Sequence, residues 1–131
     1  MNSGPAVSEG FSRDDRLRQR REFEECYASG VRVSGRHLQV FLLPAIGRSS
    51  RVRLGISVPR RVGTAVARNR VRRRLREIFR RTTRSLPSLL STGPVSLVVN
   101  ARPSAAAASL SELSQDFESA VRRASARLTR P

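Results

Sequence analysis

The sequence predicts an α+β protein, a small α/β sandwich whose elements follow in the order α-β-β-α-β-α. Apolar residues recur at helical spacing in three segments, and three other segments are short apolar or alternating runs typical of strands. The chain has 131 residues, enough for one core but too few for two. We therefore expect a single domain over residues 16–128. Residues 1–15 are polar and lack periodicity, which predicts a flexible tail.

The first expected helix covers residues 20–28. Phe23, Cys26 and Tyr27 recur in it at helical spacing, and Gly30 is well placed to follow its C-terminus. Cys26 is the only cysteine, which excludes an intramolecular disulfide and a multi-cysteine zinc site and agrees with a reducing cytoplasm. We interpret it as a small buried apolar residue rather than a nucleophile.

Two strands are expected next, at residues 37–43 and 51–58, with Pro44 and the turn-forming segment AIGRSS between them. In the second strand, valine, leucine and isoleucine alternate with arginine, glycine and serine, so that one face is apolar and the other polar. We predict that the two strands pair with each other as antiparallel neighbours. The polar face would then be available for a ligand.

A long helix is expected over residues 66–81. Its apolar stripe for packing on the sheet consists of Ala67, Val71, Leu75 and Ile78. The apolar run at 95–101 predicts a buried strand, and a final helix is expected over residues 110–128. Ser109 and Glu112 have the spacing of a capping box at the start of that helix.

The charge of the chain predicts a polyanionic partner. The formal net charge is +16, from 26 basic and 10 acidic residues, and every basic residue is arginine. Arginine binds phosphate through two parallel hydrogen bonds and also stacks on bases, so nucleic acid is the first candidate. No stretch approaches the roughly 18 apolar residues of a membrane span, and the N-terminus does not resemble a secretory signal. We expect a soluble, cytoplasmic protein that binds no membrane.

The arginines concentrate in one region of the chain. Between Arg51 and Arg84 there are thirteen arginines and a single acid, Glu77. Eight of these arginines fall on the expected long helix, where like charges four residues apart oppose helix formation by about 0.2–0.5 kcal/mol per pair. Solvated helix faces usually mix charges of both signs. A face of one sign therefore indicates phosphate binding.

The order of residues within this run is more specific than its charge. From Val62 it reads V-G-T-A-V-A-R-N-R-V-R-R-R-L-R, which resembles the signature of the bacterial ribonuclease P protein component. The resemblance covers about residues 16–101. Its positions outside the run are Arg16-Leu17, Phe23, Tyr27, Gly30, Arg36, Phe41, the R-L-G-I-S-V segment from Arg53 to Val58, and Arg60-Arg61.

This resemblance implies a protein that binds one large catalytic RNA. That RNA would cut the 5′ leader from precursor tRNA and hold most of the Mg²⁺, and the implied partners are the RNA subunit and precursor tRNA, with no protein partner required. The implied fold is ribosomal-protein-like, with a left-handed β-α-β crossover where the general rule gives a right-handed one. The implied RNA-binding residues are Arg60, Arg61, Arg68, Asn69, Arg70, Arg72, Arg73 and Arg76.

The resemblance also implies a cleft for the single-stranded leader between the first helix and the sheet. Phe23 and Tyr27 lie one helical turn apart and Phe41 lies on the adjacent strand, so the three could form an aromatic floor on which unpaired bases stack. From spacing alone, they fit an ordinary core at least as well. Gln39, on the same strand face as Phe41, is polar where the family leads us to expect an aliphatic residue.

The polypeptide itself is not expected to be the catalyst. Hydrolysis of RNA by a protein needs an acid and a base, or carboxylates that hold metal. His37 is the only histidine, and its place beside a strand favours a structural or RNA-contact role. The acids gather on the first and last helices, where helix solubility explains them better than metal binding: Glu22, Glu24, Glu25, Glu112, Asp116 and Glu118.

Two other functions are considered beside ribonuclease P. One is a non-enzymatic RNA-binding module, such as a ribosomal protein or an RNA chaperone, and the ordered A-x-x-R-N-R-V-R-R run from Ala65 argues against it. The other is a DNA-binding regulator. It would need a helix-turn-helix pattern and a dimerisation helix, and the sequence shows neither.

Overall fold

The computed structural model describes residues 20–44, 53–82 and 95–128. The expected tail and the segment AIGRSS lie outside these residues. The described part is an α+β sandwich, which confirms the predicted fold class. Its elements are α1 Arg20–Ser29, β1 Val31–Ser34, β2 Leu38–Pro44, β3 Arg53–Ser57, the short helix η2 Arg60–Val62, α2 Ala65–Thr82, β4 Val95–Ala101, the short helix η3 Pro103–Ala106 and α4 Leu110–Leu128.

The four strands form one mixed sheet in the order β1-β2-β4-β3. β2 is antiparallel to both β1 and β4, whereas β3 and β4 are parallel and α2 connects them. The prediction that β2 and β3 pair with each other is wrong, because β4 lies between them. β4 suits the centre because side chains on both of its faces are buried, namely Val95, Leu97, Val98, Val99 and Ala101. β1 was not expected from the sequence and forms a hairpin with β2.

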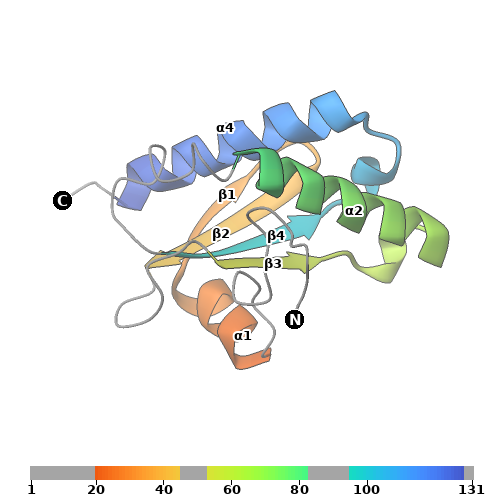
Figure 1. The fold of residues 1–131 in the computed structure, drawn as a ribbon. Helices are drawn as coiled ribbons and strands as arrows, with labels where there is room; N and C mark the ends of the chain where they lie inside the picture. Colours follow the sequence, from red (N-terminus) through yellow and green to blue (C-terminus); the bar gives the residue numbers. More distant parts are fainter. Residues whose placement is uncertain (1–19, 45–52, 83–94, 129–131) are drawn as a thin grey trace, which may run out of the picture.

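The helices cover the two faces of the sheet unequally (Figure 1). α2 and α4 lie on one face, and of the long helices in residues 20–44, 53–82 and 95–128, α1 is the one on the other face. The main core is formed between the sheet and the layer of α2 and α4, where Phe79 and Phe117 are the largest fully buried side chains. A much smaller cluster of Cys26, Phe41 and Val98 lies between α1 and the sheet. Within the part of the chain that the structure describes, the face under α1 therefore has little apolar packing.

Local hydrogen bonds fix where α2 and α4 begin. Ser109 and Glu112 form the predicted capping box: the Glu112 N–H donates to Ser109 Oγ at 3.0 Å, and the Ser109 N–H donates to Glu112 Oε1 at 2.8 Å. Thr64 Oγ1 caps α2 by accepting a hydrogen bond from the Ala67 N–H at 3.1 Å. Gly63, just before it, has a φ of 155°, which favours glycine. The three long helices begin and end within about one residue of their predicted bounds.

Asp116 anchors the turn between β1 and β2 to α4. Its carboxylate accepts hydrogen bonds from the backbone N–H groups of Arg36, His37 and Leu38 at 2.9, 2.9 and 3.0 Å. A Cβ at Gly35 would lie 2.6 Å from the same carboxylate, so a larger residue would displace it. The interpretation of Asp116 as a residue that only keeps its helix soluble is therefore wrong.

Candidate nucleic-acid interface

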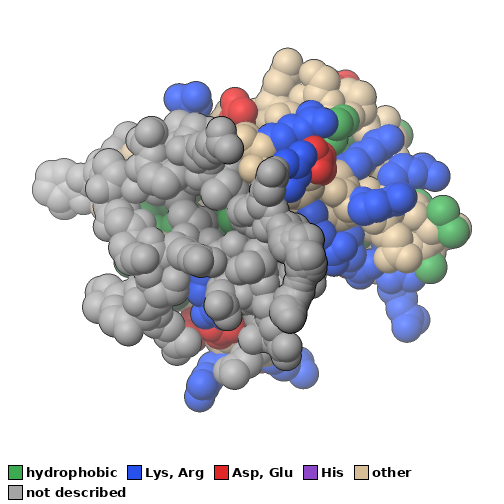
Figure 2. Space-filling model, in the orientation of Figure 1, with side chains coloured by type: hydrophobic (Ala, Val, Ile, Leu, Met, Phe, Trp, Pro, Cys, Tyr) green, Lys and Arg blue, Asp and Glu red, His purple; other side chains and the backbone are tan. Residues whose placement is uncertain are grey.

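The solvent side of α2 carries the predicted RNA-binding residues. The helix packs on the core through the buried residues Val71, Leu75, Ile78 and Phe79. The predicted residues lie on η2 and on the other sides of α2: Arg60, Arg61, Asn69, Arg70, Arg73 and Arg76 are exposed, and Arg68 and Arg72 are partly exposed. Arginine side chains gather over this part of the molecule in Figure 2. We call these eight residues the arginine surface.

Contacts within the arginine surface orient side chains without removing charge. Arg68 Nε donates a hydrogen bond to the Gly63 carbonyl at 3.3 Å. Arg72 Nη1 donates to Asn69 Oδ1 at 2.9 Å. Both acceptors are neutral, so each guanidinium keeps its full charge for a ligand. Asn69 therefore orients the Arg72 guanidinium.

Other arginines of α2 serve the fold. Arg74 Nη1 donates to the Ala108 carbonyl at 2.7 Å and so connects α2 to the segment before α4. Glu77 accepts hydrogen bonds from Arg80 at 2.6 Å and from Arg81 at 2.8 Å. These hydrogen bonds lower the pKa of Glu77 below its ordinary value. Near the C-terminus of α2, positive charge is thus partly offset.

The three predicted aromatic residues come together between α1 and the sheet. Tyr27 meets Phe41 edge to face, with ring centroids 4.8 Å apart, and Phe23 lies 6.5 Å from Tyr27. Phe41 is only 6% exposed and belongs to the small core cluster, whereas Tyr27 is 40% exposed. The core interpretation thus holds for Phe41. Tyr27 is the most exposed of the three residues.

A row of polar side chains crosses the whole sheet beside these rings. Ser34 is the register partner of Gln39, Gln39 of Asn100, and Asn100 of Ser57, so each strand contributes one residue. Gln39 Nε2 donates to Ser34 Oγ at 3.2 Å, and the Tyr27 hydroxyl donates to Asn100 Oδ1 at 2.9 Å. Asn100 was not singled out from the sequence, because its place in the row depends on the pairing of strands far apart in the chain.

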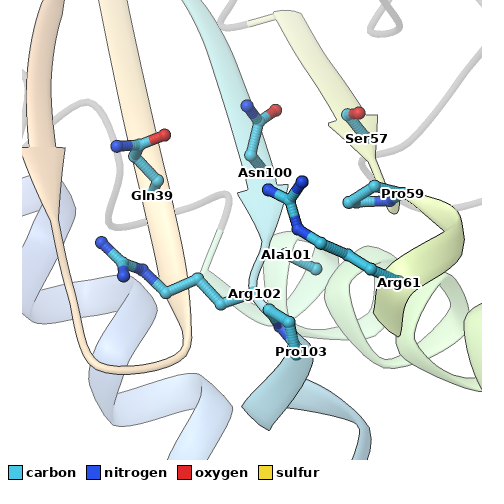
Figure 3. Close-up of a pocket in the computed structure, with 8 residues that line it drawn as sticks. All are labelled: Gln39, Ser57, Pro59, Arg61, Asn100, Ala101, Arg102 and Pro103. Atoms are coloured by element: carbon cyan, nitrogen blue, oxygen red, sulfur yellow. The ribbon is translucent and has the colours of Figure 1, made fainter. Parts of the chain in front are cut away.

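The polar row borders a pocket of about 390 Å³. Its lining consists of Gln39, Ser57, Pro59, Arg61, Asn100, Ala101, Arg102 and Pro103. Figure 3 shows the amides of Gln39 and Asn100 on neighbouring strands, with the guanidinium groups of Arg61 and Arg102 beside them. The Tyr27 hydroxyl donates to the side-chain oxygen of Asn100, so the side-chain NH₂ group of Asn100 can donate hydrogen bonds to a ligand. The pocket therefore offers cations for phosphate and hydrogen-bonding groups for a base.

His37 and Cys26, which could in principle take part in catalysis, have contacts or burial that serve the fold. His37 Nδ1 lies 2.8 Å from Ser104 Oγ, which connects the β1–β2 turn to η3. Cys26 is buried, as predicted, and this burial raises the pKa of its thiol to about 11. Within residues 20–44, 53–82 and 95–128, no three histidine, cysteine, aspartate or glutamate residues lie close enough to hold a metal ion. None of the helices in these ranges has the length and apolar character needed to span a membrane.

The molecule is a small basic α+β sandwich, with an arginine-covered helix beside a pocket. These features are typical of compact nucleic-acid-binding proteins. The comparisons with known proteins make this specific. The family model described as Ribonuclease P matches residues 11–125, which is most of the chain. The chain belongs to the ribonuclease P protein family.

Two relatives and a solved structure agree with this assignment. The chain is 42% identical to the ribonuclease P protein component of Nocardioides sp. over 117 residues, 87% of this chain and 94% of the relative. It is 47% identical to that of Desulfovibrio desulfuricans over 72 residues, 55% of each chain. The structure of the RNase P protein from Thermotoga maritima in complex with 1-(4-fluorophenyl)-2-thiourea matches with a TM-score of 0.72 at 27% identity, covering 82% of this chain and 98% of that one. The resemblance seen in the sequence is confirmed.

Proposed function

We propose that this protein, as the protein component of ribonuclease P, docks its arginine surface on the catalytic RNA and holds the 5′ leader of precursor tRNA in the cleft beside α1. It thereby supports endonucleolytic removal of the leader, which gives the mature 5′ end. The observation that carries the proposal is the position of Arg61, which lines the cleft pocket and belongs to η2, just before the arginine-bearing helix. A folded RNA and a single strand can therefore be bound side by side.

Docking on the catalytic RNA follows from rigid geometry and charge. The arginine surface projects from a helix of 18 residues that is anchored in the main core. Such guanidinium groups can follow a phosphate backbone with little loss of side-chain freedom on binding. If about five of them displace counterions, the logarithm of the affinity should fall with the logarithm of salt concentration at a slope of about −3 to −5.

Binding of the leader relies on the exposed ring of Tyr27 and on the pocket next to it. An unpaired base that stacks on an aromatic ring gains about 1–3 kcal/mol. The neighbouring amides of Gln39 and Asn100 can hydrogen-bond to the edge of that base, and Arg61 and Arg102 can hold the adjoining phosphates. The polar Gln39 therefore suits a cleft for nucleotides.

The RNA subunit is proposed to carry the phosphodiester chemistry and most of the Mg²⁺. In the described part of the chain no three histidine, cysteine, aspartate or glutamate residues lie close enough to hold a metal ion, which supports metal binding by the RNA. His37 contacts Ser104 and Asp116 holds a backbone turn, so neither is poised as a general base. We expect the protein to act in the cytoplasm on precursor tRNA and to require no protein partner.

Binding of the catalytic RNA by an Arg68→Ala, Arg73→Ala double variant tests the docking. Affinity should fall by at least about tenfold, since a hydrogen bond to a charged group is worth about 1.5–3 kcal/mol. The salt slope should become shallower by about 2, one unit for each lost phosphate contact. Filter binding over a salt series measures both quantities.

The matched control for this experiment is the double variant Arg122→Ala, Arg123→Ala. It removes the same charge from exposed positions on α4, away from the arginine surface. Its affinity for the catalytic RNA should stay much closer to that of the wild type. Equal weakening by the two double variants would show that net charge alone drives binding and would contradict docking through α2.

A further inference from the structure

The attachment of α1 to the sheet has little apolar packing. In the described part of the chain, the cluster under α1 has three buried apolar residues, whereas the core on the other face has twenty-two. Apolar contacts are not directional. Among the described residues, a cluster of this size fixes the rotation of α1 about its own axis less firmly than directional contacts do. The direction in which the side chains of α1 point decides the shape of the cleft.

A buried ion pair adds a directional contact between α1 and the sheet, beside the hydrogen bond from the more exposed Tyr27 to Asn100. Arg53 Nη1 on β3 lies 2.5 Å from Glu22 Oε2 on α1, and Arg53 Nη2 lies 3.4 Å from Glu22 Oε1. The two side chains are only 15% and 8% exposed. The interpretation of Glu22 as a residue for helix solubility is therefore wrong. Two parallel hydrogen bonds between planar groups define an orientation as well as a distance.

The position of Glu22 on the helix determines where the cleft rings point. Glu22 and Cys26 are four residues apart and form the buried face of α1. Phe23 and Tyr27 each follow one of them, so they lie about 100° further round the helix. Fixing Glu22 on Arg53 therefore turns Phe23 and Tyr27 toward the cleft.

The ion pair is poorly explained as a source of stability. Removing two charges from water is costly, and replacing a buried pair by apolar residues of similar volume is often neutral or stabilising. A gain in orientation explains the pair better. By contrast, the ion pair between Arg20 and Glu24, both on α1, is 91% and 63% exposed and is in no position to orient the helix on the sheet.

We infer that Glu22 and Arg53 are a positioning pair, which sets the rotation of α1 and so holds the aromatic side of the leader cleft in its binding geometry. This inference rests on the proposed function, because its consequence is measured as binding of the leader. It assigns no contact with RNA to either residue. The pair acts through Phe23 and Tyr27.

The double variant Glu22→Met, Arg53→Met separates positioning from stability. Its melting temperature and its affinity for the catalytic RNA should match the wild type, because apolar side chains of similar size fill the space. Its preference for leader-bearing over mature tRNA in the holoenzyme should fall by about fivefold or more, the effect of losing one base stack. The control Glu24→Gln, on the same helix, should keep the preference.

Two outcomes contradict the inference in different ways. A Met–Met variant with the full preference for leader-bearing tRNA would overturn the positioning role and leave leader binding standing. A wild-type holoenzyme without any such preference would overturn leader binding itself, and the inference with it.

The single variant Arg53→Lys gives an independent test if the Met–Met variant fails to fold. Lysine keeps the charge but cannot form the two parallel hydrogen bonds, so α1 should loosen on the sheet. Cys26, the only cysteine, lies on the buried face of α1 and should then be alkylated several-fold faster than in the wild type. The preference for leader-bearing tRNA should fall as well. Unchanged alkylation together with an unchanged preference would overturn the inference.

Discussion

The arginines of this chain differ in function according to the groups that they contact. Arg74 connects α2 to Ala108, and Arg53 orients α1 through Glu22. Arg68 and Arg72 donate hydrogen bonds to neutral acceptors, the Gly63 carbonyl and Asn69 Oδ1, which leave their charge available to a polyanion. Substituting arginines one at a time should therefore separate fold defects from binding defects.

Tyr27 is the residue at which stacking of a leader base can be tested most cleanly. Tyr27→Leu removes the ring and should lower the preference for leader-bearing over mature tRNA by about fivefold or more. Tyr27→Phe keeps the ring and loses only the hydrogen bond to Asn100, so most of the preference should remain. Competition between the two tRNAs for the holoenzyme measures this. Equal losses in both variants would mean that the hydroxyl, and not the ring, matters.

The exposed position of the arginine surface could be predicted because it depends on residues close together in the sequence. Arg68, Asn69 and Arg70 form part of one continuous motif, and the helix then places them on the solvent side. Asn100 and Glu22 could not be predicted in the same way. Their partners, Tyr27 and Arg53, are 73 and 31 residues away in the chain, and only strand register or helix docking brings each pair together.

At the scale of elements, the start of α4 is fixed by residues close together in the sequence. Its start is set by the capping box of Ser109 and Glu112, which the spacing of these residues predicted. The strands were harder to predict. β1 has only four residues, and β4 takes its place between β2 and β3 through long-range pairing that no local pattern encodes.

Loss of the capping box should destabilise the protein in a way that depends on pH. Ser109→Ala should cost about 1 kcal/mol of the free energy of unfolding at neutral pH. The hydrogen bond from the Ser109 N–H lowers the pKa of Glu112 below its ordinary value of 4.5. The contribution of Glu112 is therefore present above pH 4.5 and is lost as the pH falls through the lowered value.

Urea denaturation of the wild type and of Glu112→Gln at a series of pH values checks this dependence. The two proteins should differ at neutral pH and converge in acid, where Glu112 becomes protonated in the wild type. A difference that stays constant across the series would contradict the assigned role of the carboxylate.

At the scale of the whole molecule, the two faces of the sheet have separate tasks. The face covered by α2 and α4 holds the main core and supports the arginine surface on a rigid base (Figure 1). The face under α1 carries few buried apolar residues and instead presents rings, amides and guanidinium groups. A net charge of +16 on a chain of this size repels itself, and a bound RNA relieves that repulsion.

Cleavage of leader-bearing tRNA by the reconstituted particle, followed over a Mg²⁺ titration, tests most directly whether this protein assists a catalytic RNA. Adding the protein to its cognate RNA should raise the cleavage rate at low Mg²⁺, and the protein alone should cleave nothing at any concentration of the ion. No stimulation across the titration, or cleavage by the polypeptide without RNA, would contradict the assignment of binding to the protein and chemistry to its partner.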